Sequence, residues 1–228
     1  QPAALSARWA RNAAIVLTEA LDFQVAEIRS MLPGHEMVGE GNLGGNRGLH
    51  TAIFYDATRF AMVETGTFWL STTPAVRRSR GWGNIIPRTC TWVRLIEKSS
   101  RRAFYFYNVH LDHLSQRARK KSVIFLTNRI QGRRFPDPYI LAGDFNAEER
   151  NSTIRFLEGR TRLKNMDGRR IMNPTPLFDV FRNGDPEQPR PATYHGYRQF
   201  LFRFKYDYIF VPPFTQVEEA KEIGRAHV

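Results

Sequence analysis

A carboxylate and a carboxamide end one apolar run of the chain, Tyr139-Ile-Leu-Ala-Gly-Asp-Phe-Asn146. In an extended chain successive side chains alternate between two faces, so Asp144 and Asn146 are expected to emerge on the same side of a strand. Gly143 just before them allows the backbone to bend or a ligand to approach closely. Such an oxygen pair suits a hard cation such as magnesium. The alternative is an ordinary Asx turn at the end of a strand, where Asp and Asn are also favoured.

A carboxamide and an imidazole share one face of a second apolar segment, residues 103–111. Alternation puts Asn108 and His110 together, and Asp112 and His113 follow directly. A lone histidine is more often structural than catalytic. A histidine that follows a carboxamide at a strand end is nevertheless a candidate for contact with a substrate or for proton transfer.

Two further carboxylates are site candidates because of their positions in the sequence. Glu19 lies where an apolar strand at 13–17 passes into a helix, although an acidic residue there also favours the helix dipole. Asp207 interrupts the apolar run Tyr206-Asp-Tyr-Ile-Phe-Val211, where an unpaired carboxylate is costly. The alternative for Asp207 is a buried ion pair with Lys205 or Arg203.

Strands and helices must bring these groups together. Apolar residues recur every three or four positions over 20–32 and 116–130, which predicts two amphipathic helices. The second helix begins with a cluster of basic residues, which opposes the helix dipole and indicates another purpose for them. The other expected elements are a hairpin of 89–96 with 103–111, strands over 51–55, 60–64 and 66–70, a loop over 39–48, a short helix over 152–157, and irregular chain over 161–190.

Composition indicates one folded, soluble domain. The chain has 228 residues, 42% hydrophobic and 25% charged, without repeats or linkers. The single Cys90 excludes an internal disulfide and any multi-cysteine metal site. No apolar run approaches the roughly 18 residues of a membrane span. The opening residues do not have the pattern of a signal peptide, and the compartment stays undetermined.

The net charge of +12 and the pI near 10.3 favour a polyanionic substrate, with nucleic acid first. The alternative is that the charge serves solubility alone. No feature implies a protein partner, so a monomer is expected.

Four motifs, taken in order, resemble the endonuclease/exonuclease/phosphatase family. They are Thr18-Glu19, Asn108-Val-His-Leu-Asp-His113, Gly143-Asp-Phe-Asn146 and Tyr206-Asp-Tyr-Ile-Phe-Val211. Three other segments are similar to a bacterial-type branch without a defined function: Gly66-Thr-Phe-Trp-Leu-Ser71, Thr91-Trp92 and Thr193-Tyr-His-Gly-Tyr197. The resemblance implies an α+β fold, a four-layer α/β/β/α sandwich in which two mixed sheets pack face to face with helices outside.

The resemblance also implies hydrolysis of phosphoesters with Mg²⁺, for which Mn²⁺ could substitute. It assigns Glu19 as the metal ligand and His110 as a contact of the scissile phosphate. It has Asp144 orient or deprotonate the attacking water, Asn146 bind phosphate oxygens and Asp207 pair with a C-terminal histidine. The candidates for further phosphate contacts are Arg88, Asn108, Arg119 and His195.

Three departures from the family pattern are expected to matter. No strand carrying a metal-binding asparagine precedes Ala13, and no Ser-Asp-His follows the Asp207 motif. Leu49 stands where many relatives have a glutamate that supports the histidine. We therefore interpret residues 1–221 as one domain incomplete at both ends, and residues 222–228, with His227, as a non-native translation of a sequencing adapter.

These observations lead to three hypotheses for function. The first is a magnesium-dependent phosphodiesterase that acts on nucleic acid by water attack. The second is a phosphomonoesterase for a sugar, inositol or lipid phosphate, because family membership does not determine the leaving group. The third is an inactive chain that binds polyanions by charge alone.

Overall fold

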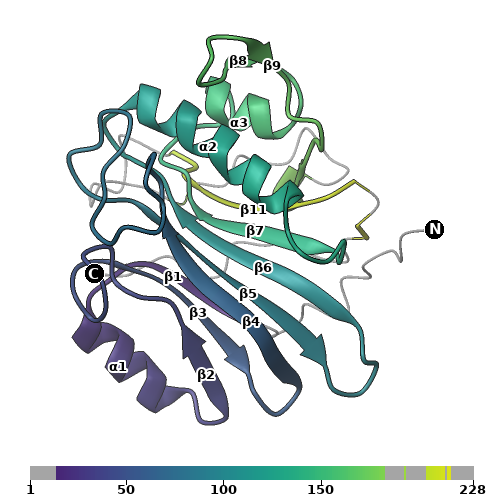
Figure 1. Ribbon diagram of the computed structural model, residues 1–228. Helices are drawn as coiled ribbons and strands as arrows, with labels where there is room; N and C mark the ends of the chain where they lie inside the picture. Colours follow the sequence, from purple (N-terminus) through teal and green to yellow (C-terminus); the bar gives the residue numbers. More distant parts are fainter. Residues whose placement is uncertain (1–13, 183–192, 194–203, 214, 217–228) are drawn as a thin grey trace.

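Two β-sheets face each other, with helices on their outer sides (Figure 1). The computed structural model describes residues 14–182, 193, 204–213 and 215–216. The smaller sheet is antiparallel, in the order β1 (Ala14–Ala20), β3 (His50–Asp56) and β2 (His35–Val38). Helix α1 (Asp22–Met31) covers its outer side through Val25, which is buried with Ala52 and Phe54 of β3.

The larger sheet has six strands in the order β10-β11-β7-β6-β5-β4. Their bounds are β4 (Phe60–Trp69), β5 (Thr89–Glu97), β6 (Ala103–His110), β7 (Tyr139–Asp144), β10 (Phe178–Asp179) and β11 (Asp207–Val211). Only β6 and β7 pair in parallel among these strands, so the sheet is mixed. Parallel neighbours need a crossover connection, and helix α2 (Gln116–Gln131) supplies it.

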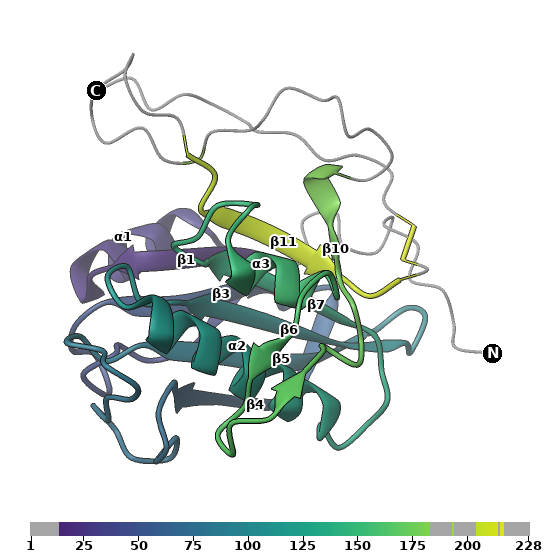
Figure 2. The same cartoon turned by 90° about the horizontal axis from the view of Figure 1, so that it is seen from above.

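Alternation along β6 divides the hydrophobic core. Phe104 and Phe106 point between the two sheets, whereas Tyr105 and Tyr107 point to the outer face, under α2. Helix α3 (Ser152–Leu157) lies beside α2 over the same face (Figure 2). The short elements are β8 (Leu163–Lys164), β9 (Arg170–Ile171) and a 3-10 turn, η2 (Val180–Arg182). The layers are therefore helix, sheet, sheet and helix, which confirms the expected sandwich.

One long strand replaces the two short ones expected over 60–64 and 66–70. Gly66 does not break β4, because it faces Trp92 across the β4–β5 ladder. A Cβ atom at position 66 would lie 2.9 Å from Trp92 Nε1, so the missing side chain makes room for the indole. The hairpin of β5 and β6, the loop over 39–48 and the two long helices are confirmed.

The carboxyl ends of β6 and β7 approach each other unusually closely. Gly143 has φ of +134°, and a Cβ atom there would lie 1.9 Å from the carbonyl oxygen of Val109. Only glycine fits this position without displacing the backbone. The close approach sets His110 beside Asp144 in register.

None of the helices in the described part of the chain combines the length and the apolar character needed to cross a membrane.

Candidate active site

The four predicted acidic and imidazole groups meet where strands of both sheets end. His110 ends β6, Asp144 ends β7 and Asp207 begins β11. In the larger sheet Asp144 has His110 as its partner on one side and Asp207 on the other. Glu19, near the end of β1, reaches this edge from the smaller sheet, with Oε1 3.5 Å from Nε2 of His110.

Glu19 is held in an unusual backbone conformation. Its φ of +64° is in the left-handed region, which non-glycine residues rarely adopt, and the β1–β3 register shifts between Leu17 and Ala20. The Glu19 side chain is 62% exposed, so the irregularity turns it out of the strand toward the solvent-facing edge. Strain of this kind concentrates at functional sites.

The carboxylates at this edge fit a divalent cation. Glu19, His110 and Asp144 each offer a ligand atom, and these atoms lie within 4.8 Å of one another. Desolvation raises the pKa of Asp144 to about 7, and the negative charges of Asp207 and Glu19 add to this effect. The charge of Arg88 offsets only part of this effect, and a hard metal such as Mg²⁺, which prefers carboxylate oxygens, would offset more of it. Glu19 and Asp144 are the donors of the type that Mg²⁺ prefers.

His110 is better placed to contact Arg88 than to bind a metal. Nη1 of Arg88 lies 2.7 Å from Nε2 of His110 and 3.0 Å from Nδ1, so it can donate to whichever nitrogen is unprotonated. Burial lowers the pKa of His110 well below its usual value, and the charges of Arg88 and His113 lower it further. His110 is therefore neutral at pH 7, and Asp144 is the group whose pKa suits proton transfer there.

A buried network holds Arg88 in place. Nη2 of Arg88 donates to Nδ1 of His113 at 2.6 Å, and Nε lies 3.6 Å from Oδ2 of Asp112. Asp112 also accepts hydrogen bonds from the backbone amides of Leu114 and Ser115. The arginine predicted to bind phosphate is thus 3% exposed and lies at the edge where β6 and β7 end.

Asn146 follows β7 in a left-handed turn, with φ of +45°. Its backbone amide donates to Oδ1 of Asp144 at 2.7 Å, and its side-chain amide donates to Leu111 O at 3.1 Å. Asn146 lines an open pocket of about 420 Å³ at this edge, whose other lining residues are Glu19, Leu49, Ile86, Arg88, His113 and Tyr206. The pocket brings the Glu19 carboxylate, the Arg88 guanidinium and the Asn146 carboxamide around one space, next to Asp144.

Two candidates for phosphate contact have other roles. Asn108 is fully buried between the sheets, where its amide donates to Leu17 O and Ala52 O at 2.9 Å. Arg119 is 9% exposed, and its guanidinium donates to Asp112 O and to Gln116 Oε1. Asn108 ties β6 to the smaller sheet and Arg119 supports the loop that carries Asp112. Neither residue lines the pocket at this edge, whereas Arg88 does.

Three other predicted residues are His195, Arg203 and Lys205. His195 lies outside the described residues, as does Arg203. Lys205 does not pair with Asp207: it binds Asp179 and lies 3.8 Å from Glu149. Asp207 instead donates its backbone amide to Oγ1 of Thr193 at 3.0 Å.

Sequence reasoning missed the roles of His113, Ile86 and Tyr206 in the pocket, and that of Asp112 behind Arg88. Asp112 and His113 stood inside the motif with His110, which was the available signal. Ile86 lies in an irregular segment that carries no periodic pattern, and nothing in its surroundings in the sequence indicated a site.

Comparison with known proteins agrees with this geometry. The model of the endonuclease/exonuclease/phosphatase family matches residues 11–225. A mannosyl-6-phosphatase of Bacteroides thetaiotaomicron is similar in structure, with a TM-score of 0.75 and 29% identity over 91% of this chain and 73% of that one. A second family protein of B. thetaiotaomicron gives the same score and identity over 91% of this chain and 70% of its own.

Among curated proteins, an uncharacterized protein of Acanthamoeba polyphaga mimivirus is 32% identical over 124 residues, 52% of this chain and 46% of that protein. The match spans about half the length of this relative. The family model covers nearly all of the sequence, and the four motifs on which the resemblance rested converge at one edge of the sandwich. The chain belongs to the endonuclease/exonuclease/phosphatase family.

Proposed function

We propose that the protein hydrolyses phosphoesters by attack of water, assisted by a divalent cation, Mg²⁺ or Mn²⁺. The observation that carries this proposal is the placement of Asp144 between His110 and Asp207, with Glu19 close by. Glu19 and Asp144 would hold the cation, which supplies charge neutralisation for the phosphoryl oxygens when it is bound.

The side chains at this edge divide the remaining work. Asp144 orients a water molecule beside the cation and accepts its proton. Arg88 offers N–H donors to phosphate oxygens while Asp112 and His113 keep its guanidinium in position. Asn146 lines the same space and adds a neutral donor or acceptor.

For the substrate we propose phosphodiesters of nucleic acid. The net charge of +12 supports this choice, because a strongly basic surface raises the local concentration of a polyanion.

A second candidate is a sugar phosphate monoester. The Bacteroides mannosyl-6-phosphatase, 29% identical over 91% of this chain, favours it. A pocket of about 420 Å³ is also of the size that encloses a small ligand.

Parallel assays of a nitrophenyl phosphodiester, single-stranded DNA and mannose 6-phosphate, each with Mg²⁺, would distinguish the candidates. Turnover of the diester and of DNA, weakened steeply by added salt, supports the first. Release of phosphate from the sugar ester alone supports the second. Glu19→Gln and Asp144→Asn should abolish either activity. Equal rates in these variants and the parent would overturn the assigned site.

A further inference from the structure

A second pocket, of about 390 Å³, opens on the outer face of the larger sheet, beside the end of α2. It is separate from the active site. Thr91 of β5 and Asn108 of β6 are paired, and both side chains point between the sheets. There Thr91 hydrogen-bonds to Thr51 and Asn108 to the carbonyl of Ala52. The next pair, Trp92 and Tyr107, therefore points to the opposite face, and both residues line this second pocket.

Trp92 forms an aromatic floor for the pocket. Its indole lies against the backbone of Gly66, where any side chain would collide with it. The Tyr107 ring is stacked at 6.5 Å and 29°, and the Tyr105 ring lies at 6.0 Å. Because Trp92 is only half-buried, part of its indole faces the pocket. The floor is therefore rigid, flat and accessible.

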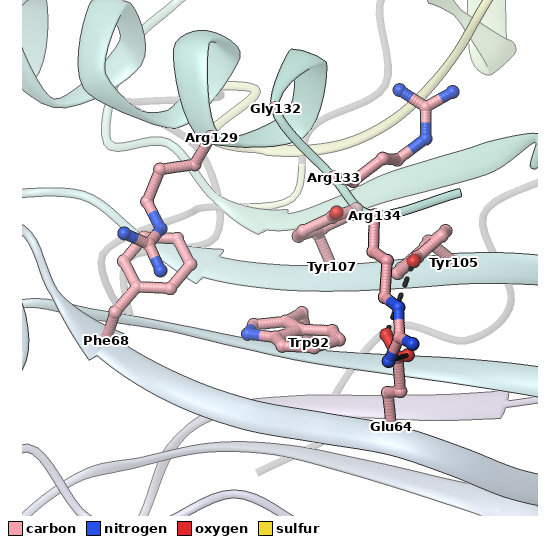
Figure 3. Close-up of a pocket in the computed structure, with 9 residues that line it drawn as sticks. All are labelled: Glu64, Phe68, Trp92, Tyr105, Tyr107, Arg129, Gly132, Arg133 and Arg134. Carbon is pink, nitrogen blue, oxygen red and sulfur yellow. Dashed lines mark hydrogen bonds and ion pairs between the residues drawn. The ribbon is translucent and has the colours of Figure 1, made fainter. Parts of the chain in front are cut away.

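The charged groups of the pocket lie on both sides of Trp92. Figure 3 shows Trp92 between Arg129 with Phe68 on one side and Arg134 with Glu64 on the other. Glu64 and Phe68 are four residues apart on the strand, which is roughly 13 Å. This span is comparable with the length of a nucleoside monophosphate.

The arginines of the pocket differ in what they already bind. Arg133 donates to the backbone carbonyls of Ile130 and Asp137, so it is part of the wall. Arg134 lies 3.3 Å from Glu64. Arg129 lies 4.8 Å over the Phe68 ring and makes no hydrogen bond or ion pair within the described part of the chain. Arg129 is thus an exposed guanidinium, held by an aromatic ring, with its N–H donors uncommitted.

We propose that this pocket binds one nucleotide unit. The base stacks on Trp92, the phosphate pairs with Arg129, and N–H groups on the base edge face the carboxylate of Glu64. Stacking on aromatic side chains combined with guanidinium contacts to phosphate is how proteins hold unpaired nucleotides. The uncommitted guanidinium of Arg129 suits the anionic end of a nucleotide. At the other end the Glu64 carboxylate, which has further acceptor capacity beside Arg134, suits N–H donors of a base.

The ligand could be a free mononucleotide or one unit of a single strand, which share this chemistry. The inference does not rest on the proposed catalytic function, because the active site lies at the strand ends, this pocket lies on the outer face of the larger sheet, and the two share no lining residue. It holds equally for a nuclease and for a sugar phosphatase.

Isothermal calorimetry in EDTA, with guanosine monophosphate as the probe, tests the proposal without turnover. Trp92→Leu removes the stacking surface and Arg129→Gln removes the phosphate contact. Each variant should bind the nucleotide about tenfold more weakly than the parent. Ribose 5-phosphate, which lacks the base, should bind about tenfold more weakly than the nucleotide. Arg155→Gln, an equal charge change at an exposed position of α3, and Asp144→Asn should leave binding unchanged.

Two results would overturn the proposal. In one, Asp144→Asn or Glu19→Gln abolishes nucleotide binding while Arg129→Gln does not, which places the ligand in the active site. In the other, ribose 5-phosphate binds as tightly as the nucleotide, which leaves an anion site without recognition of a base.

Thermal unfolding of Trp92→Leu checks that its loss of binding is not a loss of fold. Arg129→Gln, at an exposed position, tests the pocket without disturbing the packing of the sheet. Tighter binding of a short single strand than of the mononucleotide would identify the strand as the source of the ligand. Equal affinities would identify the free nucleotide.

Discussion

Asp144 and Asp207 lie directly opposite each other on the antiparallel strands β7 and β11. Like charges at such a cross-strand position repel each other and destabilise the sheet. The nearby Glu19 adds a third negative charge, and together with desolvation these charges raise the pKa of Asp144 to about 7. We therefore expect the site to be less stable without a bound cation than with one.

The first prediction concerns pH and stability. The pKa of Asp144 is about 7 in the folded protein against an ordinary 3.8, so the folded state holds this proton more tightly. Its contribution to stability is present below about pH 4 and is lost as the pH rises to about 7. In EDTA, Asp144→Asn should therefore have a higher Tm than the parent at pH 8, although it is inactive.

Thermal unfolding followed by circular dichroism from pH 4 to pH 8 measures this effect. Asp167→Asn, at an exposed position of the turn between β8 and β9, is the matched control and should keep the pH dependence of the parent. A lower Tm of Asp144→Asn at pH 8 would contradict the assignment.

The second prediction concerns the metal. Mg²⁺ should raise the Tm of the parent, and more at pH 8 than at pH 5, because protons compete with the cation for Asp144. At one hundred times the dissociation constant the stabilisation is about 2.7 kcal/mol. Glu19→Gln should lose most of it.

Measuring Tm across a Mg²⁺ titration compares the stabilisation of Glu19→Gln with that of the parent. Glu27→Gln on the exposed side of α1 carries the same charge change away from the site and should respond as the parent does. A full response in Glu19→Gln would remove Glu19 from the ligand set.

The third prediction concerns Arg88. Its positive charge lowers the pKa of His110, so Arg88→Gln should raise that pKa while burial still holds it below the usual value. An NMR titration of the histidine ring protons measures the shift. The same variant should lower kcat by about a hundredfold, as expected when one preorganised donor to the phosphate is removed.

Arg78→Gln, an exposed arginine of the loop after β4, provides the comparison for charge alone. An unchanged His110 titration in Arg88→Gln would disprove the contact between the two side chains.

The fourth prediction concerns Gly143. A Cβ atom there meets the backbone of Val109 at 1.9 Å, and Gly143→Ala should lower the free energy of unfolding by about 3 kcal/mol or more. Gly168→Ala separates sterics from backbone strain, because Gly168 also has a positive φ of 79° but no atom within 4 Å of its Cβ position. It should cost about 1 kcal/mol. Urea denaturation compares the two, and equal losses would mean that the approach to Val109 is unimportant.

Much of the fold could be predicted because it follows local rules. The period of apolar residues specified α1 and α2, and the polar turn after residue 97 specified the β5–β6 hairpin. The break expected between the strands 60–64 and 66–70 was wrong, because Gly66 continues the strand and leaves room for Trp92 of the neighbouring strand. That role depends on a pairing between distant residues, which no local pattern contains.

The site divides in the same way. Alternation placed Asn108 and His110 on one face, which is correct. Asn108, however, is buried between the sheets, whereas His110 lies at the strand end beside Glu19. Distance from the strand end decides between these outcomes. The basic start of α2 had a purpose, which for Arg119 is to bind the backbone of Asp112 rather than phosphate.

The left-handed conformations of Glu19 and Asn146 bear on the redesign of this protein. Glycine adopts such a backbone without strain, so a sequence optimised on this fold for thermal resistance alone would favour glycine at both positions. The substitutions would remove the proposed metal ligand Glu19 and the pocket residue Asn146 in the same step. Engineering for thermal stability should therefore leave these two residues unchanged and place stabilising substitutions in the exposed loops and on helix surfaces.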